Sequence, residues 1–129
     1  MPEGFPASTG DIFTAADYNG LVTFGIGTAN TVDYTAVSAD QYQVLELMNK
    51  ATAIAYKIPT NASVAFPIGT VLNILNIGAG VCTISAVTSG TTTILSAGAV
   101  AAAPTLAQYK SAACIKTGTD AWYVVGAIG

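Results

Sequence analysis

The sequence predicts an all-β protein, a single antiparallel β-sandwich or β-barrel domain that follows an extended N-terminal arm. From residue 31 onward, short runs of β-forming residues recur roughly every 8–12 residues with turn residues between them, which is typical of sandwiches and barrels. No long helical periodicity separates these runs, so a βαβ fold is not expected. Residues 1–30 instead carry scattered glycines, prolines and aromatic residues. We therefore expect an arm over 1–30 and a β module over 31–129.

The expected strands of the β module alternate between two faces. In residues 51–58, Ile54, Tyr56 and Ile58 fall on one face while Ala55 and Lys57 fall on the other, which is the period of a half-buried strand. Similar runs predict strands at residues 31–37, 42–48, 71–77, 81–87, 91–95, 106–109, 112–117 and 121–128.

Turn residues separate these runs. Residues 38–41 and 118–120 read as turns, and turn chemistry accounts for Asp40 and Asp120. Glycines at both ends of residues 78–80 predict a hairpin loop that joins 71–77 to 81–87. Within 71–77 we expect a β-bulge, because Leu75 and Asn76 interrupt the alternation.

The arm contains one segment that favours a helix. Asp11 to Leu21 could form a short helix, with Thr14 as N-cap and a stop at Gly20. The arm's aromatic residues have little local core to enter, so they either dock into another subunit or fold back onto their own domain. The candidate assembly contacts are Phe5, Phe13, Tyr18 and Phe24 of the arm, together with Trp122 and Tyr123 near the C-terminus.

The chain carries very little charge. Hydrophobic residues make up 52% of it and charged residues 9%, against roughly 25% charged in an average soluble domain. A free monomer needs surface charge to stay apart from its copies, so this composition favours a surface covered by other subunits. The alternative is a soluble monomer hydrated by Thr, Ser, Asn and Gln.

Other functional classes are disfavoured by the same composition. A net charge of −3 and the absence of arginine argue against binding to nucleic acid. Polar and glycine residues interrupt every apolar run, so we expect no membrane span. The N-terminal residues lack a basic region and an apolar core, so we expect no signal peptide and synthesis in the cytoplasm.

Catalytic and metal sites are not expected. The sequence has no histidine, which excludes a Ser-His-Asp or Cys-His site and a common zinc site. A carboxylate pair such as Asp33 with Glu46 keeps a glycan hydrolase open as a third function. Cys82 and Cys114 lie in apolar runs and are expected to be buried and reduced, although a bridge between strands is an alternative. We expect no enzyme activity and no cofactor.

The two conspicuous aromatic residues of the last strand occupy adjacent positions. Trp122 and Tyr123 must point to opposite faces of a strand. One is expected in the core and the other at an interface, where aromatic residues are enriched. Sugar binding by the exposed ring is a weaker alternative.

Several segments resemble proteins of bacteriophage virions. Ser63 to Thr70, Ile77 to Gly80 and the stretch from Tyr109 through Lys116-Thr117-Gly118-Thr119-Asp120 to Trp122 resemble a β module of phage virion structural proteins. This module is often found at the ends of tail fibres and in small capsid-associated proteins. Residues Ile12 to Asn19 also resemble the opening of many phage tail and fibre proteins.

The resemblance implies a virion protein, commonly a homotrimer, that contacts the major capsid protein or a neighbouring virion protein. It carries over no catalytic residue. The chain departs from typical fibres because no collagen-like or coiled-coil shaft lies between the first segment and the β module. This favours a capsid decoration (cement) protein or a short head appendage. The alternative is a tail-fibre or adaptor module that binds a host receptor or glycan.

Overall fold

The computed structural model describes residue 15 and residues 23–129, and this part of the chain is mostly β. The expected helix over 11–21, apart from Ala15, and the aromatic residues Phe5, Phe13 and Tyr18 lie outside the described residues. One short 3₁₀ helix, η1, occupies the expected turn at Ser38–Gln41. The ten strands are β1 (Gly25–Ile26), β2 (Tyr34–Thr35), β3 (Val44–Met48), β4 (Ile54–Ile58), β5 (Val71–Asn76), β6 (Cys82–Ala86), β7 (Thr93–Leu95), β8 (Thr105–Leu106), β9 (Lys110–Gly118) and β10 (Ala121–Gly126).

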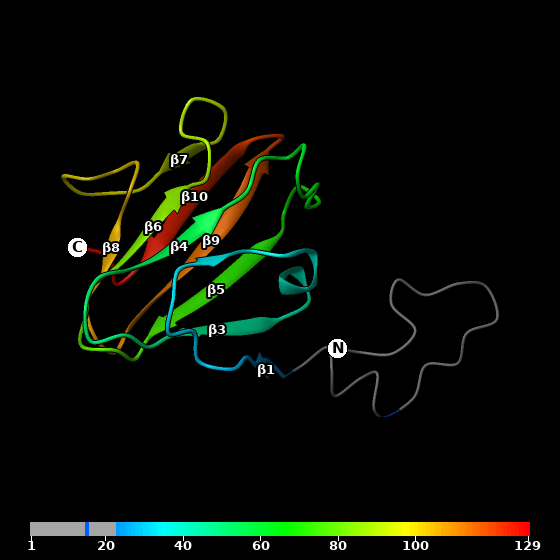
Figure 1. The fold of residues 1–129 in the computed structure, drawn as a ribbon. Helices are drawn as coiled ribbons and strands as arrows, with labels where there is room; N and C mark the ends of the chain where they lie inside the picture. Colours follow the sequence, from blue (N-terminus) through cyan, green and yellow to red (C-terminus); the bar gives the residue numbers. More distant parts are fainter. Residues whose placement is uncertain (1–14, 16–22) are drawn as a thin grey trace.

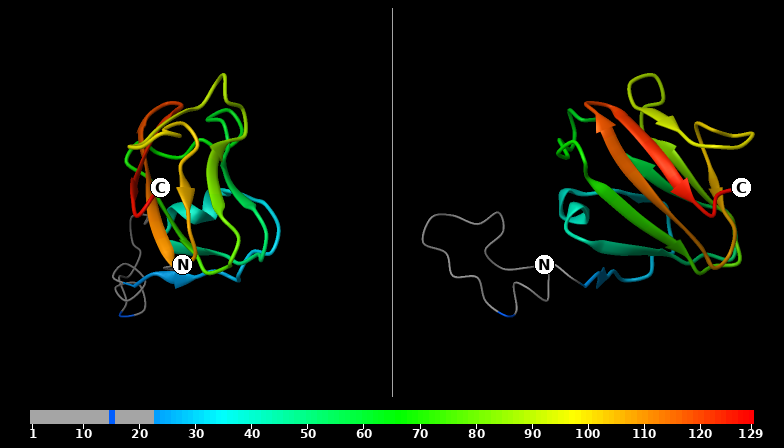
Figure 2. Two further views of the ribbon diagram at one scale, coloured as in Figure 1. Left: turned by 90° about the vertical axis from the view of Figure 1, so that its left-hand side faces the viewer. Right: turned by 180° about the vertical axis from the view of Figure 1, so that it is seen from behind.

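The strands form two sheets that lie one behind the other. The larger sheet has the order β1-β3-β5-β9-β10-β7, and the smaller has the order β2-β4-β6-β8. Figure 1 shows the smaller sheet in front, and the edge-on view in Figure 2 shows the two sheets as separate layers. An all-β architecture is therefore confirmed.

The expectation of purely antiparallel pairing was wrong. The chain alternates between the two sheets, so β1, β3 and β5 pair in parallel in one sheet. Strands β2, β4 and β6 pair in parallel in the other. Parallel neighbours need a crossover connection, and here each crossover runs through a strand of the opposite sheet. The chain thus winds as a flattened coil over β1–β6. Antiparallel pairing follows where β8 joins β6 and where β9 joins β5 and β10.

The predicted hairpin at residues 78–80 is also absent, because β5 and β6 belong to different sheets. The glycines of this loop serve a different purpose. A Cβ atom on Gly78 would overlap the backbone nitrogen of Lys50, and one on Gly80 would overlap the carbonyl oxygen of Thr52. The loop therefore stacks directly on the backbone of the preceding turn of the coil, and only glycine fits there.

The core lies between the sheets and follows the predicted alternation. Ile54, Tyr56 and Ile58 of β4 are buried, as are Cys82 and Ile84 of β6. The larger sheet contributes its own alternate residues, namely Met48, Leu72, Ile74, Ala112, Cys114, Trp122 and Val124. The alternation expected for residues 51–58 is thus confirmed in β4.

The expected bulge in β5 was misplaced. The strand pairs without a register shift, and the irregularity falls in β10 between Ala121 and Trp122. Asn76 therefore points into the core, where it is fully buried. Its side-chain nitrogen donates hydrogen bonds to the carbonyl oxygens of Gly80 and Leu106, at 2.9 and 2.8 Å. Its side-chain oxygen accepts one from the Gly78 N–H at 3.1 Å. The amide thereby fastens β5 to the smaller sheet.

A second buried polar residue closes the other end of the core. The Lys116 ammonium donates to the side-chain oxygen of Asn61 at 2.6 Å and to the carbonyl oxygen of Phe66 at 2.7 Å. It also lies 5.9 Å from the ring centre of Trp122, which packs edge-on against Phe66. Burial lowers the pKa of this ammonium group, whereas nearby Asp120 raises it. These contacts compensate for the removal of the charge from water.

Candidate assembly surface

The outer face of the larger sheet carries two rows of paired, mostly apolar residues. One row of paired residues crosses four strands and consists of Val71, Ile115, Tyr123 and Leu95. A second row crosses five strands and consists of Ile26, Leu45, Asn73, Ala113 and Val125. We call these nine residues the apolar sheet face. None of the charged residues that the structure describes lies in either row.

Large side chains on this face are open to solvent. Ile26 is 65% exposed, Val125 50%, Tyr123 48% and Leu95 44%. Single exposed hydrophobic residues are ordinary, but a contiguous apolar patch on a sheet marks an interaction site. The apolar sheet face is therefore the strongest candidate for a functional surface in the described part of the chain.

Two shallow hollows shape the apolar sheet face. The first, of about 340 Å³, is lined by Phe24, Leu45, Asn73 and Val125 among others. The second, of about 420 Å³, is lined by Leu95, Tyr123, Val125 and Ile128 among others. They share Val125 and Gly126. An exposed aromatic ring thus borders each hollow, Phe24 at one and Tyr123 at the other.

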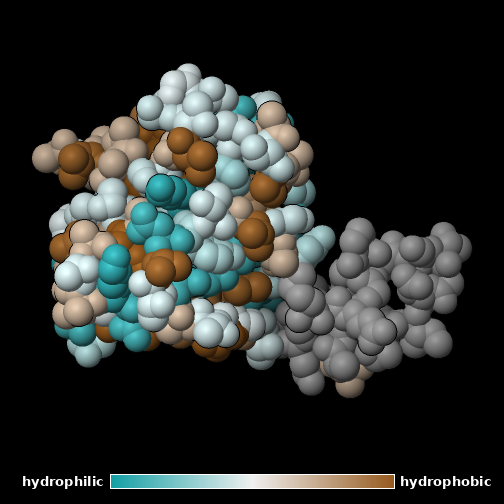
Figure 3. Space-filling view, in the orientation of Figure 1, coloured by the Kyte–Doolittle hydropathy of each residue, from teal (hydrophilic) through white to brown (hydrophobic). Residues whose placement is uncertain are grey.

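The outer face of the smaller sheet differs in chemistry. Its outward positions include Thr35, Lys57, Thr83, Ser85 and Thr105, and Figure 3 shows hydrophilic residues gathered in the middle of this side. Hydroxyl and charged groups are well solvated in water, so this face needs no partner. The contrast between the two sheets singles out the larger one.

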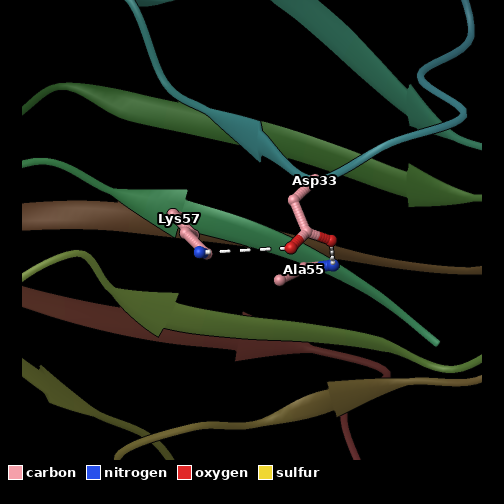
Figure 4. Close-up of polar contacts among 3 residues, drawn as sticks. All are labelled: Asp33, Ala55 and Lys57. Atoms are coloured by element: carbon pink, nitrogen blue, oxygen red, sulfur yellow. Dashed lines mark hydrogen bonds and ion pairs between the residues drawn. The ribbon is translucent and has the colours of Figure 1, made fainter.

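A surface carboxylate continues the ladder of the smaller sheet. Asp33 accepts a hydrogen bond from the Ala55 N–H at 2.9 Å, and its second oxygen lies 4.0 Å from the Lys57 ammonium (Figure 4). Both charged side chains are substantially exposed, so this ion pair contributes little to stability. The Asp33 carboxylate thus provides a hydrogen-bond acceptor for the backbone of β4, just before β2 begins to pair with that strand.

Asp33 and Glu46, which the sequence offered as a possible hydrolase pair, contact different parts of the structure. Asp33 contacts β4, whereas Glu46 accepts a hydrogen bond from the Asn30 side chain at 3.0 Å. Burial raises the pKa of Glu46; the hydrogen bond from Asn30 lowers it, and the neighbouring Asp40 raises it again. Asp40 in turn accepts hydrogen bonds from the Tyr34 hydroxyl at 2.7 Å and the Val37 N–H at 2.9 Å. This group of side chains fastens η1 and the segment around Asn30 to β3.

Asp40 and Asp120 both have structural roles, as the sequence suggested. Asp40 accepts from Val37 within its own turn. Asp120 instead joins distant loops, because its side-chain oxygen accepts from the Asn61 N–H at 2.8 Å and from the Thr92 hydroxyl at 3.3 Å. The sequence located this residue in a turn but gave no sign of these partners.

The sequence-predicted aromatic contacts separate into three groups. Tyr123 and Phe24 are about half exposed and border the two hollows. Trp122 is 2% exposed, so it is a core residue and does not offer a surface to a partner. The opposite orientations predicted for Trp122 and Tyr123 are thus confirmed. Phe5, Phe13 and Tyr18 belong to the part of the chain that is not described.

Cys82 of the smaller sheet and Cys114 of the larger sheet both point into the core and form no disulfide bridge. Cys82 and Cys114 are both free and fully buried, which confirms the expected packing role. Burial raises the pKa of Cys82 to about 11 and that of Cys114 to about 12. Both therefore remain protonated thiols at neutral pH.

Among residues 23–129, no group of three His, Cys, Asp or Glu side chains is arranged to hold a metal ion. No helix in this part of the chain is long and apolar enough to cross a membrane.

Comparison with family models, with curated proteins and with solved structures finds no match to this chain.

Sequence reasoning missed most residues of the apolar sheet face. Val71, Ile115, Leu95 and Val125 were read as ordinary members of half-buried strands. A signal was present, because residues 121–125 are apolar at inner and outer positions alike. A strand that is apolar on both sides is typical of burial on both sides.

Proposed function

We propose that this chain is a non-enzymatic structural protein of a bacteriophage virion, a capsid decoration (cement) protein or a short head appendage that stabilises the particle. The observation that carries the proposal is the uncharged apolar sheet face, because an exposed apolar patch of this kind marks a surface that binds a partner. The resemblance of Ser63 to Thr70 and of the segment leading to Trp122 to virion β modules supplies the biological setting.

The proposed architecture is a β-sandwich that assembles as a homotrimer. Each sheet ends in two edge strands, β1 and β7 or β2 and β8, which supports two open layers rather than a closed barrel. A rigid block of this kind suits a protein whose work is to resist deformation. Many weak attachments of such blocks to one capsid would add up through multivalency.

The proposal is tested on purified phage particles. Mass spectrometry should find the chain at a fixed ratio to the major capsid protein, and gold-labelled antibody should mark the head. Particles made without it should lose their DNA at lower temperature or in weaker osmotic shock. Absence of the chain from washed particles would reject the proposal.

A tail-fibre or adaptor module that binds a host receptor or glycan is the second candidate. The polar outer face of the smaller sheet favours it, because Thr83, Ser85 and Thr105 offer hydroxyl groups beside Lys57. Such groups hydrogen-bond sugars. Antibody labelling confined to the tail, with a few copies per particle, would select this candidate. Release of sugar products from host polysaccharide would instead indicate the hydrolase.

A further inference from the structure

The apolar sheet face carries a more specific inference about its partner, which rests on the proposed structural role. We infer that the face packs against the same face of other copies of this chain, so that identical subunits join through their larger sheets. The polar outer faces of the smaller sheets then point away from the joint. In a trimer, the three larger sheets would turn toward the common axis.

The absence of charge in the two rows restricts what can cover them. A charged partner surface would lose its hydration against this face and find no opposite charge there. The partner must therefore present an uncharged surface of its own. The face of a second copy meets this condition, because neither row holds a charged group and their only polar side chains are Asn73 and Tyr123.

The shape of the face also fits a second copy. Each subunit offers two half-exposed aromatic rings, Phe24 and Tyr123, each of which lines one shallow hollow. A ring of one subunit can enter a hollow of the next, and symmetry repeats that contact at every joint. Aromatic residues in such pockets supply most of the binding energy at interfaces.

The nine positions of the apolar sheet face form the centre of the joint. One position covers about 4.8 by 6.6 Å on one side of a sheet, so the nine give a flat footprint of roughly 290 Å². A specific interface buries roughly 500 Å² or more per partner. The joint must therefore also include exposed side chains beside the two rows, such as Phe24.

The experiment measures the mass of the full chain in solution by light scattering across a concentration series. Wild type should form a discrete multimer. Tyr123→Lys and Val125→Lys place a charge in the joint, so each should raise the concentration at half assembly by ~30-fold or more. The matched control is Thr83→Lys, which adds the same charge to the outer face of the smaller sheet and should leave the mass unchanged.

Each variant is first checked for folding by the fluorescence of Trp122, the single tryptophan, which is buried. If the lysine variants unfold, Tyr123→Ser and Val125→Ser replace them and should weaken assembly in the same direction. A multimer that survives every face variant would overturn the inference, since the joint would then lie elsewhere.

A monomeric wild type would also overturn the inference, and a further variant would then identify the occupant. If changing Phe5, Phe13 and Tyr18 together to serine made the monomer associate, the chain's own N-terminal residues would be the cover. If the triple variant stayed monomeric, a different virion protein would be the partner. These outcomes leave the particle-labelling test of virion location untouched, so the two proposals fail separately.

Discussion

The buried amide of Asn76 provides the sharpest test of how the two sheets are joined. Asn76→Ala removes three buried hydrogen bonds, to Gly80, Leu106 and Gly78. At about 1 kcal/mol for each bond, the free energy of unfolding should fall by about 3 kcal/mol. With a urea dependence of about 1–3 kcal/mol per molar, the unfolding midpoint should drop by roughly 1–3 M. Trp122 fluorescence reports the transition.

The matched control for this experiment lies on the same strand. Asn73 has the same chemistry but points outward, so Asn73→Ala should cost less than about 1 kcal/mol. Both variants and wild type are compared at one low protein concentration, because assembly adds to apparent stability. If Asn76→Ala proved as mild as Asn73→Ala, the amide would not fasten β5 to the smaller sheet, and the reasoning would be refuted.

Three further experiments test other parts of the structure. Burial raises the pKa of Glu46, so the folded state holds this proton more tightly than the unfolded state does. The free energy of unfolding should therefore fall as pH rises above 4.5. Glu46→Gln should make this fall smaller in urea titrations at several pH values. Gly80→Ala sets a methyl group against a backbone oxygen and should cost about 2–3 kcal/mol, whereas Gly90→Ala, which meets open space, should be nearly neutral by thermal melting. Cys82 and Cys114 should resist a thiol reagent in the native protein and both react in denaturant; rapid native labelling would contradict their burial.

Strand positions and inner faces were largely predictable from the sequence. The alternation of Ile54, Tyr56 and Ile58 identified the buried side of β4 correctly. The same alternation says nothing about which strand lies alongside. Ile54 pairs with Cys82, and a whole strand of the other sheet separates them along the chain. Local turn signals such as Gly78 and Gly80 favoured a hairpin, while the stacking of backbones that these glycines permit is a long-range property.

The candidate surface was only partly predictable. One of Trp122 and Tyr123 was expected at an interface because adjacent strand residues point to opposite faces, and Tyr123 is the exposed one. The neighbouring rows could not be assembled from the sequence, because Val71, Ile115 and Leu95 meet only through the pairing of β5, β9, β10 and β7. The burial of Asn76 was not predicted for a different reason. A polar side chain was expected to point out of the core, and the sequence does not show the hydrogen-bond partners that satisfy it there.

The winding of the chain has a consequence for how such a protein can change length. Twenty-eight positions separate Leu45 from its partner Asn73, and the same number separates Ile54 from Cys82. One full turn of the coil at this point is thus a segment of 28 residues, after which each strand pairs in register with the strand one turn earlier in its own sheet. Duplication of that segment in a gene would lengthen each layer by one strand, about 4.8 Å, with inward and outward residues kept in phase. Strands β9, β10 and β7 would still end one layer and β8 the other, as a terminal cap ends a repeat array.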